Sequence, residues 1–269
     1  MSGPLSPQQR LKTRTDYFFR SRSRSRAEVA SFASRMAELG PVVVIGGMLR
    51  ELYLGGNRNF VSDVDLVVNP TSMSEFDRVA TQFQAKINRF GGYGLKLARW
   101  KIDVWPLERT WAAVHGYVDV RDVTDLLKVT FFDWDAITYQ YHQKSINCGE
   151  HYFEKVDRRV LDINLEPNPN PLGNAVRALR YAWRWNAKLG PRLAHHVYVQ
   201  LCERGWDGLV DAERSSFISQ ILRHVDGSRI FSSLRSLERE GWPRPVRLPL
   251  SAEQIKFPAT FGFNENQSE

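Results

Sequence analysis

The chain has 269 residues, 42% of them hydrophobic, which is enough for a core of one or two domains and excludes a disordered chain. It has two cysteines, too few for a disulfide framework or a thiolate zinc site, and no apolar run resembles a membrane span or signal peptide, so we expect a cytoplasmic protein without a membrane partner. The net charge of +7 favours a polyanionic partner, although basic proteins without one are common.

Residues 1–26 are polar and basic and end in alternating arginine and serine. This pattern offers no apolar face to a core, so we expect a basic flexible arm. The arm either contacts phosphates or is an ordinary solvated segment, and the sequence leaves both interpretations open. Residues 27–39 then have apolar side chains at helical spacing, which predicts the first helix.

A β-branched run at residues 42–45 predicts a buried strand, and Gly46-Gly47 ends it. Residues 48–54 have helical spacing, so the backbone N–H groups that follow the glycines can hold an anion such as a phosphate. Residues 62–68, Ser-Asp-Val-Asp-Leu-Val-Val, then run into a second apolar strand.

Two carboxylates, Asp63 and Asp65, stand at the start of this strand. Side chains two residues apart on a strand point to the same face. Adjacent carboxylates repel each other, and a divalent cation such as Mg²⁺ removes that cost. Asp-x-Asp alone is common and is more often solvated, but here it follows a Gly-Gly turn between strands. The combination predicts metal-assisted phosphoryl or nucleotidyl transfer.

Residues 46–55, Gly-Gly-Met-Leu-Arg-Glu-Leu-Tyr-Leu-Gly, together with residues 62–68 resemble the head domain of the DNA polymerase β-type nucleotidyltransferase superfamily. They are most similar to the bacterial poly(A) polymerase and tRNA CCA-adding branch, with Glu51 where that branch usually has Asp. The resemblance implies transfer of a nucleoside monophosphate from a nucleoside triphosphate to an acceptor hydroxyl. It implies nucleotide binding by Gly46, Gly47, Arg50 and Ser62.

Residues 74–90 have the apolar spacing of a second helix, and residues 95–107 alternate like strands. Asp103 lies in this second segment between two apolar residues, where a carboxylate needs a partner. By the resemblance, Asp103 is the third catalytic carboxylate, and it binds two Mg²⁺ ions together with Asp63 and Asp65. The alternative is an edge-strand aspartate that faces water.

Residues 122–141 are predicted to be helical, and their aromatic positions correspond to those of the family. The polar positions differ, because residues 129–131 are Val-Thr-Phe where that branch has Arg-Arg-Asp, and Asp135 replaces an asparagine. The nucleotide is therefore expected to be held differently here. Residues 152–164 resemble the small strand-turn element that follows in the family.

The proline-rich residues 166–171 predict a domain boundary, so we expect a head at 27–165 and a helical, neck-like domain with a polar tail at 166–269. Residues 172–188 predict an amphipathic helix, and residues 192–238 also have a helical pattern. The basic stripe of the first helix either follows RNA or nucleotide phosphates or is a solvated face; it consists of Arg177, Arg180, Arg184 and Lys188.

In the tRNA enzymes, the turn before this helix carries Glu-Asp-x-x-Arg, which selects the incoming base. Residues 170–174 here are Asn-Pro-Leu-Gly-Asn, so standard CCA addition is not expected. We expect an α/β (α+β) head with a mixed, largely antiparallel β-sheet and a small C-terminal helical domain, acting on an RNA acceptor. The alternatives are transfer to a protein or small molecule, and a non-catalytic RNA- or protein-binding module on a degenerate head.

Overall fold

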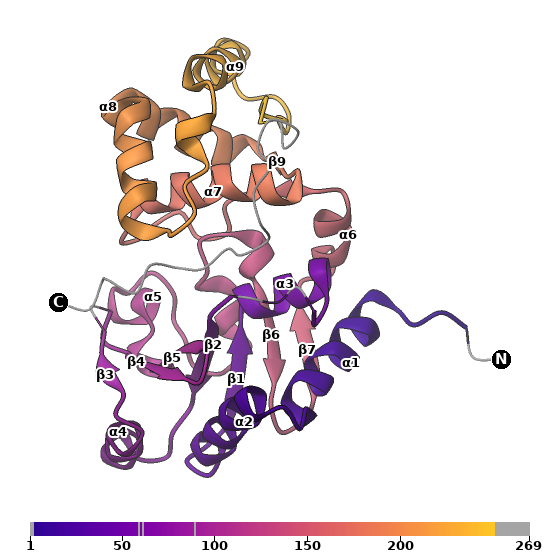
Figure 1. The fold of residues 1–269 in the computed structure, drawn as a ribbon, viewed down its shortest axis with the longest axis vertical. Helices are drawn as coiled ribbons and strands as arrows, with labels where there is room; N and C mark the ends of the chain where they lie inside the picture. The colour runs from indigo at the N-terminus through magenta and orange to yellow at the C-terminus, as the bar shows by residue number, and fades with distance from the viewer. Residues whose placement is uncertain (1–2, 59, 61, 89, 251–269) are drawn as a thin grey trace. The chain divides into compact units, whose positions relative to one another are not determined.

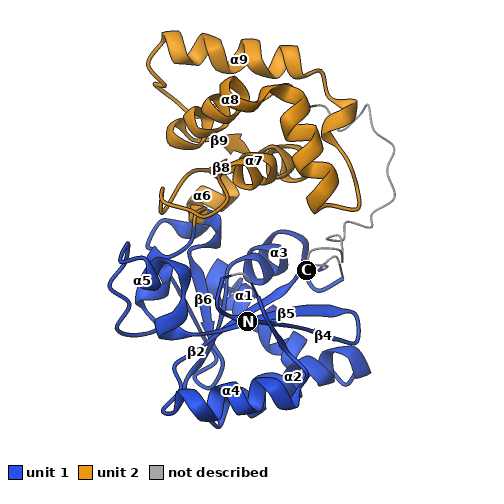
Figure 2. Ribbon diagram, turned by 90° about the vertical axis from the view of Figure 1, so that its left-hand side faces the viewer, with its two compact units in different colours: residues 1–130, 134–153 blue, residues 131–133, 154–269 orange. Residues whose placement is uncertain are grey.

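The computed structural model describes residues 3–58, 60, 62–88 and 90–250, and it divides into two compact units (Figure 1). The first unit contains residues 1–130 and 134–153, and the second contains residues 131–133 and 154–269, as Figure 2 shows in two colours. The first unit ends before the predicted boundary at residue 165, because strand β8 (Val160–Leu161) pairs with β9 (Lys188–Leu189) in the second unit. The predicted polar tail from residue 251 onward lies outside the described residues.

The first unit is built on a seven-stranded sheet with the order β3-β4-β5-β2-β1-β6-β7. Strands β2 and β5 run parallel and the other neighbouring pairs run antiparallel, which confirms the predicted mixed, largely antiparallel sheet. The strands are β1 (Val42–Ile45), β2 (Val64–Val68), β3 (Lys86–Ile87), β4 (Tyr93–Leu97), β5 (Trp100–Pro106), β6 (Ile137–Gln140) and β7 (Ser145–Cys148).

The helices of the first unit pack on this sheet and around its edges. They are α1 (Pro7–Arg20), α2 (Arg24–Ala37), α3 (Gly47–Gly55), α4 (Met73–Gln82), α5 (Trp111–Val114) and the 3₁₀ turns η1 (Leu107–Arg109) and η2 (Asp125–Lys128). The four residues of β1 are all buried, as expected for a central strand. On one face, Val43, Ile45 and Val67 pack with Leu107 and Leu126, so η2 closes that side of the core.

The prediction of a flexible arm at residues 1–26 is wrong for the described residues, because most of them form helix α1. Ser6 caps the helix and Gln9 completes a capping box. Leu11, Thr15 and Phe18 are buried, at spacings of four and three residues. These three buried positions form a narrow stripe among the polar and charged residues of α1, and this stripe packs the helix onto the rest of the first unit.

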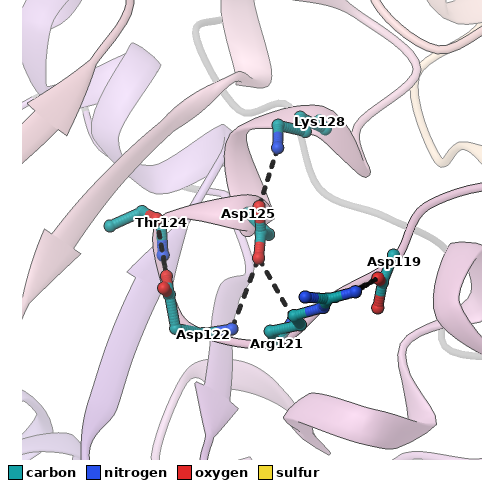
Figure 3. A network of polar contacts seen from close by, with 6 residues as sticks. All are labelled: Asp119, Arg121, Asp122, Thr124, Asp125 and Lys128. Carbon is teal, nitrogen blue, oxygen red and sulfur yellow. Dashed lines mark hydrogen bonds and ion pairs between the residues drawn. The ribbon is translucent and has the colours of Figure 1, made fainter.

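The predicted helix at 122–141 is also wrong, and Figure 3 shows the polar contacts that form at its start. The Asp125 carboxylate accepts hydrogen bonds from the backbone N–H groups of Arg121 (3.1 Å) and Asp122 (3.4 Å) and from Lys128 Nζ (2.7 Å). Asp122 accepts the N–H of Thr124 at 2.6 Å. These local bonds satisfy backbone groups without a long helix. The chain then passes through the short turns η2 and η3 (Asp133–Asp135) into strand β6.

The predicted helix at 74–90 is present as α4 but ends at Gln82. Gln84 adopts a left-handed φ of 57°, which a continuing helix does not allow. Strand β3 follows two residues later.

The second unit is mainly helical, as the sequence predicts, with α7 (Pro171–Trp185), α8 (Pro191–Ser216), η4 (Leu222–His224) and α9 (Gly227–Arg239). Helix α6 (Tyr152–Asp157) lies at the junction of the two units in the chain. Helix α8 is interrupted at Gly205, whose φ of 67° is in the left-handed region. None of the helices in the described part of the chain is long and apolar enough to cross a membrane.

Candidate active site

The parallel pairing of β2 with β5 brings the three predicted carboxylates together. Asp65 of β2 is the direct register partner of Asp103 on β5. Asp63 lies two residues before Asp65, so its side chain shares that face of the sheet. On its other side, Asp65 pairs with Ile45, the residue that immediately precedes the Gly46-Gly47 turn. The sheet register therefore sets the carboxylates beside the start of α3.

This carboxylate cluster, Asp63, Asp65 and Asp103, is short of positive charge. Burial raises the pKa of Asp63 to about 6; Lys101 opposes this rise and Asp103 adds to it. Burial also raises the pKa of Asp65 well above its ordinary value, and repulsion from Asp103 and Asp63 contributes. Because ionising these groups together is unfavourable, the site favours a bound cation.

Lys101, a residue that the sequence interpretation missed, supplies part of the positive charge that the carboxylate cluster lacks. Its Nζ lies 3.1 Å from Asp103 Oδ2 and 3.5 Å from Asp63 Oδ2. Burial opposes the charged form of Lys101, but Asp103 and Asp63 outweigh it and raise its pKa. The signal in the sequence was its position two residues before Asp103, because alternate residues on β5 share one face.

The cluster fits a divalent cation by its chemistry. Within the described residues, no group of three or more His, Cys, Asp or Glu side chains is already arranged as a metal site. The available donors are nevertheless carboxylate oxygens, the ligands that Mg²⁺ prefers. Two of these carboxylates already contact a cationic group, the ammonium of Lys101. The residues present therefore suit the predicted magnesium ions.

The glycine turn gives α3 its close approach to Ser62. Gly46 has φ +73° and ψ −122°, a conformation that a residue with a side chain rarely adopts. A Cβ atom on Gly47 would lie 3.2 Å from Ser62 Oγ, which is tighter than ordinary contact, and 3.5 Å from Arg50 Nη2. The structure thus brings together the predicted nucleotide-binding residues Gly46, Gly47 and Ser62, with the guanidinium of Arg50 beside Gly47.

The fourth, Arg50, has a structural partner instead of an open position. Its side chain is only 3% exposed and forms an ion pair with Asp135 of η3. The neighbouring residues of α3 are also buried, so Arg50 points into the unit. The sequence interpretation missed Asp135 as its partner, although an acidic residue between Trp134 and Ala136 gave the same signal that identified Asp103.

The predicted basic stripe of α7 does not form one surface. Arg180 is buried, pairs with Glu213 at 2.5 Å and donates to the backbone oxygen of Ser219 at 2.7 Å. Lys188 lies on strand β9, beyond the end of the helix. The stripe therefore reduces to two partly exposed arginines, Arg177 and Arg184. Periodicity alone could not show that α8 covers Arg180, because its partner lies 33 residues along the chain.

The two asparagines at the start of α7 are occupied by local contacts. Asn170 caps the helix, and its Oδ1 accepts the N–H of Gly173 at 3.0 Å. Asn174 is 2% exposed and accepts a hydrogen bond from Arg177. Both asparagines therefore stabilise the helix itself.

No model of a known protein family matches this sequence, and no curated protein sequence matches it either. Among solved structures, a complex of a CCA-adding enzyme with CTP matches with a TM-score of 0.52 and 18% identity, covering 77% of this chain and 50% of that chain. A tRNA nucleotidyltransferase complexed with a primer tRNA and an incoming ATP analogue matches with a TM-score of 0.49 and 19% identity, over 78% of this chain and 60% of the other. A Thermotoga maritima CCA-adding enzyme complexed with tRNA matches with a TM-score of 0.48 and 18% identity, over 68% and 46% of the two chains.

The chain thus spans about half to three-fifths of the length of the solved structures that it resembles. At this level of identity the similarity concerns the fold: the chain has the nucleotidyltransferase fold seen in a CCA-adding enzyme.

Proposed function

We propose that this protein is a metal-dependent nucleotidyltransferase that transfers a nucleoside monophosphate from a nucleoside triphosphate to an acceptor hydroxyl. The observation that carries the proposal is the register of β2 on β5, which sets Asp65 against Asp103 beside the glycine turn. The shared nucleotidyltransferase fold supports it. The acceptor oxygen would bond to the α-phosphorus as the bond to the leaving pyrophosphate breaks, and the hydroxyl proton would pass to solvent.

In this mechanism Asp63, Asp65 and Asp103 would hold two Mg²⁺ ions, which when bound neutralise phosphate charge and activate the attacking hydroxyl. The first backbone N–H groups of α3 have no acceptor one turn earlier in the helix, so they suit triphosphate oxygens. Gly47 leaves room for that approach, and the Ser62 hydroxyl beside it can donate to a phosphate. Arg50 acts indirectly, because its ion pair with Asp135 fixes α3 to η3.

We propose RNA as the acceptor, and the distribution of charge supports this choice. Residues 1–26 hold seven of the 37 lysines and arginines and one of the 30 acidic residues, so they carry +6 of the chain's net charge of +7. Arg14 and Arg26 are used within the unit, since they donate to backbone oxygens of residues 52, 53 and 57. Arg20, Arg22 and Arg24 are exposed at the turn from α1 to α2 and form what we call the basic corner.

The direct test is incubation of the protein with each of the four nucleoside triphosphates, labelled at the α-phosphate, with Mg²⁺ and total cellular RNA. We expect label in RNA and release of pyrophosphate, both dependent on Mg²⁺. Asp63→Ala and Asp65→Ala should each abolish transfer while circular dichroism stays unchanged. The matched control is Asp119→Ala, which removes a surface carboxylate paired with Arg121. Activity within a few-fold of wild type in either cluster variant would sink the assignment.

The same experiment separates the alternatives. Pyrophosphate release that requires a protein or small-molecule acceptor, with no labelled RNA, would keep the chemistry and change the acceptor. RNA binding without pyrophosphate release from any triphosphate would identify a non-catalytic binding module. The altered positions 129–131 and Asp135 make this second outcome worth measuring, because the resembled enzymes use other residues there.

A further inference from the structure

The ammonium of Lys101 lies between two carboxylates of the proposed metal site. Val64 pairs with Ile102 in the β2–β5 register, so the preceding residues of the two strands, Asp63 and Lys101, come side by side. Lys101 also shares a face of β5 with Asp103, two residues later. The contacts measure 3.5 Å to Asp63 Oδ2 and 3.1 Å to Asp103 Oδ2.

The charges at this point do not balance without a further cation. When ionised, the three carboxylates carry more negative charge than the single ammonium of Lys101 offsets, so divalent cations are attracted to the cluster. The oxygen atoms that contact Lys101 Nζ belong to the same carboxylates that would bind the metal. A lysine ammonium and Mg²⁺ therefore compete for the same donors.

The two partners differ in their freedom to move. The side chain of Lys101 is 55% exposed, whereas those of Asp63 and Asp103 are 21% and 13% exposed. Lysine has a flexible four-carbon stem and a strongly hydrated ammonium, so it can move into water at small cost. Asp103 lies on strand β5, and Asp63 lies immediately before strand β2. Lys101 is therefore the group in this cluster that can move most easily.

We propose that Lys101 is a displaceable counter-ion, which holds Asp63 and Asp103 together while the site is metal-free and moves into solvent when a divalent cation binds. The inference rests on the proposed function for the use of a metal, but it concerns metal binding and not transfer. It assigns Lys101 two opposing effects. Lys101 stabilises the metal-free protein, and it weakens the binding of the free cation.

The first test is calorimetric titration of Mg²⁺ into the metal-free protein without nucleotide, repeated with Mn²⁺ by electron paramagnetic resonance. Breaking an exposed ion pair costs little, so Lys101→Met should tighten metal binding by about threefold to tenfold. Lys101→Arg keeps the charge and should stay close to wild type. Lys128→Met is the matched control, because it removes a lysine from a surface ion pair with Asp125 and should change nothing at the site.

The second test is thermal unfolding in EDTA and then in Mg²⁺. Lys101→Met should unfold at a lower temperature than wild type in EDTA, and Mg²⁺ should raise its unfolding temperature by more than that of wild type. Unchanged or weaker metal binding in Lys101→Met would overturn the proposal, as would wild-type protein that binds neither ion. Tighter binding in this variant supports the proposal even if no variant turns over a triphosphate, in which case it is the proposed function that fails.

Discussion

At the scale of single residues, an aspartate carboxylate has opposite effects on stability at two positions, Asp125 and Asp65. The Asp125 carboxylate accepts hydrogen bonds from two backbone N–H groups and from Lys128, and the Lys128 bond is the largest cause that lowers its pKa, to about 2. For Asp65, burial and repulsion from Asp103 and Asp63 outweigh the attraction of Lys101 and raise its pKa well above the ordinary value. The Asp125 carboxylate therefore stabilises the fold when ionised, whereas an ionised Asp65 destabilises the metal-free fold.

This contrast gives a prediction for stability. Asp65→Asn should abolish nucleotidyl transfer, yet it should raise the free energy of unfolding of the metal-free protein, because it removes one charge from a repelling cluster. Asp125→Asn should do the reverse, with transfer retained and stability lowered. Urea unfolding in EDTA measures both changes. A loss of stability in Asp65→Asn would show that its carboxylate is stabilised in the metal-free fold.

A second residue-scale prediction concerns Asp133 of the second unit. Burial raises its pKa to about 6, although it accepts the backbone N–H of Asp162 at 2.9 Å and lies 3.4 Å from Lys155 Nζ. The pKa of an aspartate in the unfolded chain has its usual value of 3.8, so the folded state binds the Asp133 proton more tightly than the unfolded state does. The stabilising contribution is complete below about pH 4 and is lost as the pH rises through about 6.

Asp133→Asn should remove this dependence while its side-chain oxygen still accepts the Asp162 N–H. The wild type loses stability as the pH rises from 4 to 7, and the variant does not. The unfolding free energy of the variant minus that of wild type should therefore increase over this range by an amount on the order of 1 kcal/mol. Asp63 contributes a parallel effect in both proteins, so it cancels in the comparison. Equal pH profiles for the two proteins would contradict the assignment.

At the scale of elements, α1 combines two tasks on opposite sides. Its buried side holds Phe18, whose ring contacts those of Phe19, Phe60 and Trp100 at centroid distances of 5.2 to 5.4 Å. Its exposed end and the start of α2 carry the basic corner. Deleting the N-terminal segment would therefore remove core packing together with charge. Point variants are needed to test whether this element binds RNA.

We expect Arg22→Gln to weaken binding to single-stranded RNA and to lower the slope of log affinity against log salt by roughly 0.7, because one phosphate contact is lost. Changing all three arginines of the basic corner should lower the slope further. The control Arg78→Gln removes an exposed arginine of α4 that pairs with Glu75 and should leave the slope unchanged. Asp63→Ala should also bind RNA normally. Equal slopes for Arg22→Gln and Arg78→Gln would mean that the basic corner is only solvated surface.

At the scale of the whole molecule, short-range patterns predicted most of the fold. The β-branched runs predicted β1 and β2, and the glycines predicted the turn between β1 and α3. The mixed sheet and the place of Asp103 beside Asp63 and Asp65 were expected from the resemblance to the nucleotidyltransferase family. What the sequence could not show is which distant residue meets which side chain. Arg50 forms an ion pair with Asp135, and Arg180 forms one with Glu213. Both arginines were expected to bind nucleotide or RNA, and both instead bind another part of the protein. The segment at 122–141 was misjudged because short aromatic runs fit a helix and a strand equally well.

The final prediction concerns the choice of nucleotide. In this chain the side chain of Asn170 is bonded to Gly173, and that of Asn174 is buried and bonded to Arg177. The side-chain oxygen of neither residue can accept from the edge of a base without giving up its contact in α7. A site discriminates strongly only when unmet hydrogen bonds penalise the wrong ligand. We therefore expect rates with the four triphosphates to differ by less than about tenfold. The measurement is single-nucleotide extension of one RNA primer with each triphosphate alone. Ordered addition of C, C and then A to a truncated tRNA would show that residues 170–174 do not govern the choice.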